Sequence, residues 1–100
     1  MDWQEADYVN QYCPKLNGMI EYKLSDSTRV DCLTPTYAVE FDWCHKWAEG
    51  VGQSLFYAHM TNRKPVLVLI CSDKEKHRFI KRAQLAAPEL KIIVIEKRAG

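Results

Sequence analysis

The segment YAVEFDW, residues 37–43, alternates strictly between positions that suit two different environments. Such alternation is typical of a β-strand, because successive side chains of a strand point to opposite faces. Glu40 and Asp42 fall on one face of the expected strand, and Phe41 and Trp43 fall on the other. With a rise of about 3.3 Å per residue, the two acidic positions are about 6.6 Å apart. The segment therefore predicts a strand that presents two carboxylates on a single face.

Periodicity on either side of this strand predicts the other helices and strands. The run from Val66 to Cys71 is continuously apolar, which is typical of a strand buried on both faces. We expect the last strand to be buried as well, and Asp2 to cap the first helix. The expected helices cover residues 2–16, 44–59 and 74–87, and the expected strands cover residues 19–24, 29–33, 37–43, 66–71 and 91–96.

This α-β-β-β-α-β-α-β order predicts an α/β fold. Three consecutive strands joined by short turns form an antiparallel meander, and strands that alternate with helices are joined by parallel crossovers. We therefore expect a mixed sheet with helices on both sides. The chain has 100 residues, which predicts one domain over residues 1–100.

Composition excludes several classes of protein. Hydrophobic residues make up 47% of the chain, charged residues 27%, and the net charge is +1. These values exclude a disordered polyelectrolyte and a histone-like basic protein. No stretch approaches 18 apolar residues, so we expect no membrane span. The acidic start lacks the apolar run of a signal peptide, so we expect a cytoplasmic protein.

The four cysteines contain no Cys-x-x-Cys pair, which argues against a zinc ribbon. Most of them lie within or beside apolar runs, and free cysteine is among the most buried residue types. The sequence therefore predicts buried free thiols in a reducing cytosol.

A third carboxylate belongs with the two on the central strand. In the strand over residues 29–33, Asp31 points opposite to its apolar neighbours. If this strand pairs with residues 37–43 as a hairpin, Asp31 can lie beside Glu40. Carboxylates that close repel one another unless they take up protons or a cation, and such oxygen ligands suit Mg²⁺ or Mn²⁺. The alternative is an ordinary solvated sheet face.

The following helix carries further polar residues. Lys46 lies in its first turn, an unusual place for a cation, because helix N-termini favour anions. Gln53 and Tyr57 are four residues apart and share a helical face. That pair suits contact with a nucleic acid, and it equally suits a half-buried helix face.

Taken together, these residues resemble the PD-(D/E)XK nuclease superfamily, especially its RecB-like and Holliday-junction-resolvase-like branches. Asp31 resembles the acid of the second core strand, and Glu40 resembles the acid of the Glu-x-Lys motif. The resemblance implies a restriction-endonuclease-like core. The motif lysine is replaced by Asp42, and Lys46 looks like a relocated substitute. Residues 52–58 look like the Gln-x-x-x-Tyr motif, and Glu5 looks like the acid often supplied by the first helix.

The resemblance implies metal-dependent hydrolysis of phosphodiester bonds, in DNA rather than RNA. Asp31 and Glu40, with Glu5, would hold Mg²⁺ or Mn²⁺, while Asp42 and Lys46 would complete the catalytic set. The alternatives are a nuclease-like module that binds nucleic acid or a protein partner without cutting, and an unrelated interaction domain. The small size suits a homodimer and a phage or mobile-element protein. Substrate contacts are expected from Gln53, Tyr57, Arg63 and Lys64, with further basic residues at Lys74, Lys76, Arg78, Lys81 and Arg82.

Overall fold

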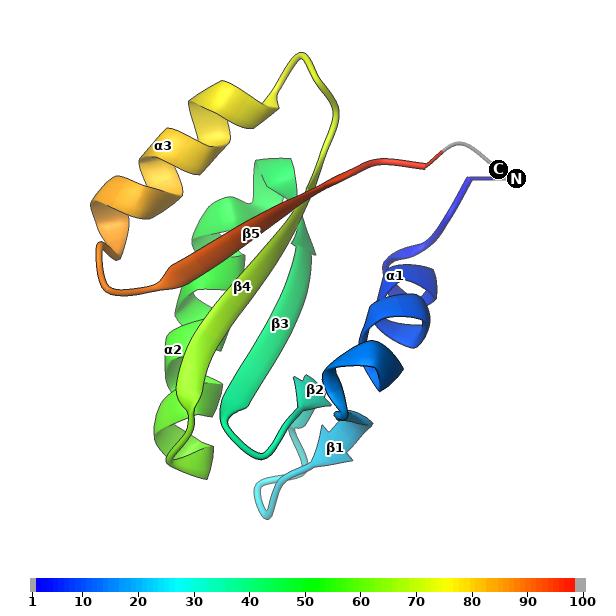
Figure 1. The fold of residues 1–100 in the computed structure, drawn as a ribbon. Coiled ribbons are helices and arrows are strands. Elements are labelled where there is room, and N and C mark those ends of the chain that lie inside the picture. Colours follow the sequence, from blue (N-terminus) through cyan, green and yellow to red (C-terminus); the bar gives the residue numbers. More distant parts are fainter. Residues whose placement is uncertain (1, 99–100) are drawn as a thin grey trace.

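The computed structural model describes residues 2–98. These residues form an α/β fold with a five-stranded mixed sheet, and the helices and strands follow one another in the expected order (Figure 1). The helices are α1 (Glu5–Tyr12), η1 (Pro14–Leu16), η2 (Cys44–Lys46), α2 (Trp47–Thr61) and α3 (Lys76–Ala86), and the strands are β1 (Met19–Lys23), β2 (Arg29–Leu33), β3 (Tyr37–Trp43), β4 (Lys64–Cys71) and β5 (Lys91–Glu96).

The sheet combines the two kinds of pairing that the sequence predicts. Its strand order is β1-β2-β3-β4-β5. The pairs β1–β2 and β2–β3 are antiparallel, and the pairs β3–β4 and β4–β5 are parallel. The carboxyl ends of β3, β4 and β5 therefore meet at one edge of the sheet.

Helices cover both faces of this sheet, as expected. α1 packs on one face, where Tyr8 and Val9 join a core with Phe41 of β3. α2 and α3 pack on the other face, where Val51 and Ala83 join a core with residues of β4. Asp42 and Trp43 therefore lie at the same edge of the sheet and face different helical layers.

Several expected boundaries are wrong, for identifiable reasons. α1 begins at Glu5 rather than at residue 2, because the carboxylate of Asp7 accepts a hydrogen bond from the Gln4 N–H at 2.7 Å. The expected cap at Asp2 is therefore wrong. A 3₁₀ turn precedes α2 and leaves Lys46 at its N-cap rather than inside its first turn. The expected burial of the last strand is also wrong, since β5 is an edge strand in which Ile93 is 38% exposed.

The expectation of free thiols is wrong. Cys13 is bonded to Cys32, and Cys44 is bonded to Cys71. Disulfides persist in oxidising environments, so they remove the argument from cysteine usage for a reducing cytosol. Within residues 2–98, no helix has the length and apolar character needed to cross a membrane.

Two glycines of α2 make a matched pair for testing how closely this helix packs. A Cβ at Gly50 would lie 2.8 Å from Leu67 Cδ1 and 3.3 Å from Asp42 Cβ, whereas a Cβ at Gly52 would have no heavy atom within 4 Å. Leu67 is fully buried and has little freedom to move. We therefore expect Gly50→Ala to cost about 1–3 kcal/mol through overpacking, and Gly52→Ala to gain about 0.5–1 kcal/mol through helix propensity. Urea unfolding of the two variants measures this, and equal effects would contradict the close approach of α2.

Candidate functional site

Asp31 and Glu40 meet where β2 and β3 separate. The two strands pair only at Cys32↔Val39 and Leu33↔Ala38. Beyond that point, hydrogen bonds to side chains take the place of hydrogen bonds between the two backbones. The Asp31 N–H donates to Glu40 Oε2 at 2.8 Å, and the Phe41 N–H donates to Asp31 Oδ2 at 2.8 Å. The expected meeting of Asp31 and Glu40 is therefore confirmed, and it is held by reciprocal hydrogen bonds.

Glu21 of β1 adds a carboxylate that the sequence reasoning missed. The β1–β2 pairing skips Glu21 and Asp31, and Glu21 has φ 52°, a left-handed conformation that is uncommon for residues other than glycine. Glu5, Glu21 and Asp31 line a shared cavity of about 230 Å³. A signal was available, because a hairpin closed by residues 25–27 places Glu21 opposite Asp31.

Burial distinguishes this site from a solvated sheet face. Glu40 is 2% exposed and Asp42 is 4% exposed, while Asp31 and Glu5 are half-buried. Asp42 Oδ1 accepts a hydrogen bond from its neighbour, the Trp43 N–H, at 2.9 Å. The alternative of an ordinary solvated face is therefore excluded for the two acids of β3.

All four expected acids hold their protons more tightly than usual. Burial, followed by the charge of Asp31, raises the pKa of Glu40 from 4.5 to about 9. Burial raises the pKa of Asp31 to about 6, with contributions from Glu21 and Asp42. Burial likewise raises the pKa of Asp42 to about 6. Burial, and then the charges of Asp42 and Asp31, raise the pKa of Glu5 to about 7. The charge of another member of the group therefore raises the pKa of Glu5, Asp31 and Glu40, and the charge of Glu49 raises that of Asp42.

Lys46 supplies part of the missing positive charge. It lowers the pKa of Glu5 and of Asp42, against the larger effect of burial. Lys46 is not among the main causes of the pKa shifts of Asp31 and Glu40. The structure thus brings Lys46 close enough to Asp42 and Glu5 for its charge to act on both.

α2 places Tyr57 on the other side of the acids. Tyr57 is 8% exposed, and burial followed by the charge of Glu40 raises the pKa of its hydroxyl. Gln53 lies one turn earlier on α2 and is half-buried. The fully buried Ser54 hydroxyl between them has no hydrogen-bond partner among residues 2–98. α2 therefore carries polar groups along the side that covers β3.

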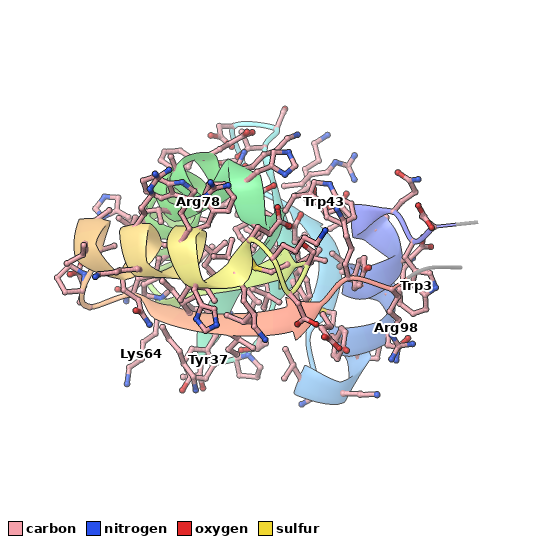
Figure 2. All side chains as sticks on the ribbon, turned by 90° about the horizontal axis from the view of Figure 1, so that it is seen from above. Trp3, Tyr37, Trp43, Lys64, Arg78 and Arg98 are labelled. Carbon is pink, nitrogen blue, oxygen red and sulfur yellow. A yellow bond between two sulfur atoms is a disulfide. The ribbon has the colours of Figure 1, made fainter. Side chains whose placement is uncertain are left out.

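Arg63 and Lys64 lie apart from the acids at the carboxyl end of β3. Lys64 begins β4 and pairs with Tyr37 at the start of β3, five residues before Asp42. Figure 2 labels Lys64, Tyr37 and Trp43, of which the first two lie where β4 and β3 begin and the third lies where β3 ends. A substrate that touches both Lys64 and Asp42 must therefore span most of the length of β3.

The acidic group suits a hard cation chemically. Carboxylate oxygens are the ligands that Mg²⁺ and Mn²⁺ prefer. Lys46 lowers the pKa of Glu5 and of Asp42, and His45 lowers that of Asp42, yet burial still raises both pKa values. Within residues 2–98, no three His, Cys, Asp or Glu side chains are already grouped as a metal site. Binding a cation here therefore requires the side chains to turn toward it.

The raised pKa values predict how stability depends on pH. As the pH rises above the ordinary values of 3.8 and 4.5, the unfolded chain releases these protons before the folded protein does. The metal-free protein should therefore lose stability between about pH 5 and pH 9 as the folded-state groups near 6, 7 and 9 are forced to ionise. Thermal unfolding in EDTA at several pH values measures this. A constant or rising midpoint over that range would contradict the burial of these acids.

Comparison with protein-family models, with curated proteins and with solved structures finds no match to this chain.

Proposed function

We propose that this protein is a divalent-metal-dependent nuclease that hydrolyses phosphodiester bonds in DNA. The observation that carries the proposal is the reciprocal pair of the half-buried Asp31 and the buried Glu40, between β2 and β3, with the pKa of Glu40 raised by burial to about 9. Buried acids with strongly perturbed pKa values are costly to keep and cluster at functional sites. The resemblance to the PD-(D/E)XK superfamily, including a restriction-endonuclease-like core, stays part of this proposal.

Asp31 and Glu40 would hold Mg²⁺ or Mn²⁺, with Glu5 and Asp42 as further ligands. A bound divalent ion supplies a Lewis acid that lowers the pKa of water and stabilises negative charge at phosphorus. The chain's own residues have separate tasks. Glu40 holds the Asp31 backbone through the 2.8 Å hydrogen bond, and this fixes where the Asp31 carboxylate lies. Lys46, beside Asp42, would offset charge on the reacting phosphate.

Nucleic-acid contacts would come from α2 and from the basic second half of the chain. Tyr57 lies close enough to Glu40 for their charges to interact, so it can position a strand next to the acids. Residues 60–100 contain ten Lys and Arg against four acids. Such an excess favours a polyanion. Homodimerisation stays a prediction, and analytical ultracentrifugation can test it by measuring the molar mass in solution.

The test is cleavage of supercoiled, linear and branched DNA, and of RNA, in Mg²⁺, Mn²⁺ or EDTA. We expect cutting that depends on the divalent ion and is absent in EDTA. An Asp31→Asn variant that folds normally should not cut, whereas Asp26→Asn, in the exposed turn after β1, should cut normally. Binding of nucleic acid without cutting would instead favour the catalytically silent module. If the protein neither binds nor cuts nucleic acid, the remaining alternative is the unrelated interaction domain.

Lys46→Ala tests the relocated lysine. Because the charge of Lys46 acts on Asp42 and Glu5 and is not among the main causes of the raised pKa of Asp31 or Glu40, we expect its loss to lower turnover by about 10²–10³-fold while metal affinity changes much less. Single-turnover cleavage and Mn²⁺ titration measure the two effects separately. Lys23→Ala, on exposed β1, is the control. Wild-type cleavage by Lys46→Ala would show that Lys46 has no catalytic task.

A further inference from the structure

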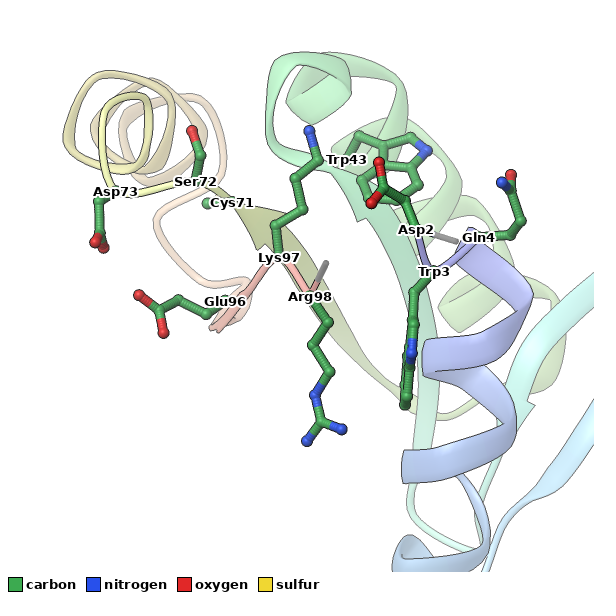
Figure 3. A pocket seen from close by; sticks show the side chains of 10 residues that line it. All are labelled: Asp2, Trp3, Gln4, Trp43, Cys71, Ser72, Asp73, Glu96, Lys97 and Arg98. Atoms are coloured by element: carbon green, nitrogen blue, oxygen red, sulfur yellow. The ribbon is translucent and has the colours of Figure 1, made fainter. Parts of the chain in front are cut away.

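A second cavity, of about 520 Å³, opens where β3, β4 and β5 end. Figure 3 shows it between the segment that precedes α1 and the loop that follows β4. None of the acids described above lines it. Its volume lies within the range of about 300–1,000 Å³ typical of ligand pockets, and ligands of open α/β sheets bind outside the carboxyl ends of the strands.

Two indole rings form one wall of this cavity. Trp3 and Trp43 each meet the ring of Tyr8 edge to face, at centroid distances of 5.1 and 5.9 Å. Tyr8 is fully buried, and its hydroxyl accepts a hydrogen bond from the Arg98 N–H at 2.7 Å. The aromatic wall is therefore held in place from behind, so its rings lose little conformational entropy when a ligand binds.

Two cations lie over these indoles. Lys97 Nζ is 5.2 Å from the ring centroid of Trp43, and the Arg98 guanidinium is 4.7 Å from that of Trp3. Among residues 2–98 neither cation takes part in a salt bridge. Bases stack on aromatic rings and on guanidinium planes, and unpaired cations bind phosphate. This wall thus has the chemistry for both parts of a nucleotide.

The opposite wall carries acceptors. Figure 3 shows Asp73 and Glu96 on the side of the cavity away from Trp3. Asp73 is paired with Lys76 at 3.2 Å, and hydrogen bonds to Lys76 and then to Glu96 lower its pKa. A carboxylate oxygen that is not used by Asp73 can accept a hydrogen bond from the amino group of cytosine. Glu96 can therefore distinguish bases that carry an amino group from those that do not.

We propose that this cavity holds one unpaired nucleotide of the strand that the acidic site cuts, with its base beside Trp3 and Trp43 and its phosphate at Lys97 and Arg98. The inference rests on the proposed nuclease function. The two sites are adjacent in the chain, since Trp43 follows Asp42 and Gln4 precedes Glu5. A base enters such a cavity only when it is unstacked from its neighbours. The substrate is therefore single-stranded or contains an unpaired position.

The test measures nucleotide binding in EDTA, where no cleavage occurs. Deoxycytidine monophosphate, thymidine monophosphate and inorganic phosphate are titrated by calorimetry. We expect deoxycytidine monophosphate to bind in about the millimolar range, where the binding free energy is about −4 kcal/mol. The double variant Lys97→Ala, Arg98→Ala should bind it at least fivefold more weakly. Glu96→Gln should remove its advantage over thymidine monophosphate.

The control is Lys15→Ala, which removes a cation that lies 5.6 Å from the Tyr12 ring, away from the cavity. Equal binding by this control and by the double variant would overturn the proposal. So would binding of inorganic phosphate as tight as that of the nucleotide, or no saturable nucleotide binding. Glu40→Gln should bind the nucleotide like the wild type. Nucleotide binding that follows these variants in a protein that cuts no substrate would refute the nuclease function while leaving the nucleotide site in place.

Discussion

Glu40→Gln is expected to abolish divalent-dependent cleavage and, at the same time, to stabilise the metal-free protein. The amide keeps an oxygen that can accept a hydrogen bond from the Asp31 N–H, which lies 2.8 Å from Oε2 in the wild type. It removes an acid whose pKa burial raises from 4.5 to about 9. Above pH 4.5 the wild-type carboxyl holds its proton only in the folded state, so its contribution to stability falls as the pH rises toward 9. The variant loses that dependence.

The expected changes in cleavage rate and in stability are both large enough to measure. Loss of a ligand should lower cleavage by at least about 100-fold, since removal of supporting groups alone costs about 10–100-fold. At pH 8 we expect the variant to gain about 1–3 kcal/mol, because it removes an acid whose pKa burial raises to about 9. A gain of this kind raises the unfolding midpoint by about 4–8 °C per kcal/mol in a domain of this size.

Thermal unfolding of both proteins, with and without Mn²⁺, separates the two roles of Glu40. The wild type should gain stability from Mn²⁺ by mass action, about 2.7 kcal/mol at a concentration 100 times the dissociation constant. Glu40→Gln should gain little. Glu89→Gln, the same change at an exposed position, serves as control. A Glu40→Gln variant that is less stable than the wild type at pH 8, or that still cuts, would show that Glu40 is a structural acid.

Strand periodicity was sufficient to predict the centre of this site. The alternation of residues 37–43 placed Glu40 and Asp42 on one face, and the hairpin placed Asp31 beside Glu40. Periodicity could not reveal that the β2–β3 ladder opens at Asp31, because that depends on side chains competing for backbone N–H groups. Nor could it reveal the left-handed conformation of Glu21, which arises where β1 bends away from the regular pairing.

The cysteines show a different limit. Cys13 and Cys32 are 19 residues apart in sequence, and Cys44 and Cys71 are 27 apart. Whether such pairs meet depends on how α1 and η2 dock on the sheet, and no spacing rule contains that information. The prediction that these side chains are buried is therefore confirmed, and the prediction that they are free thiols is wrong.

Opening the two disulfides is expected to cost most of the stability of the fold. In the loop-entropy description, a closed loop of about 15 residues contributes about 3 kcal/mol, and longer loops contribute more. Two such bonds amount to about 6–8 kcal/mol, against a typical total of about 5–15 kcal/mol for a domain. We expect the oxidised protein to show no free thiols when denatured, and the protein reduced with a dithiol to unfold at a much lower temperature. Four reactive thiols before reduction would restore the prediction of free cysteines.

The two bonds should differ in what they do to the proposed site, because they hold different parts of it. Cys32 directly follows Asp31 and is bonded to the residue after α1, the helix that carries Glu5. Cys44 lies two residues from both Asp42 and Lys46 and is bonded to the end of β4. Cys13→Ala with Cys32→Ala should therefore weaken Mn²⁺ binding. Cys44→Ala with Cys71→Ala should mainly lower the cleavage rate at saturating Mn²⁺, through displacement of Lys46. Equal loss of affinity and rate in both double variants, each measured below its unfolding temperature, would show that the disulfides act on the fold as a whole and leave the acidic site without a dedicated constraint.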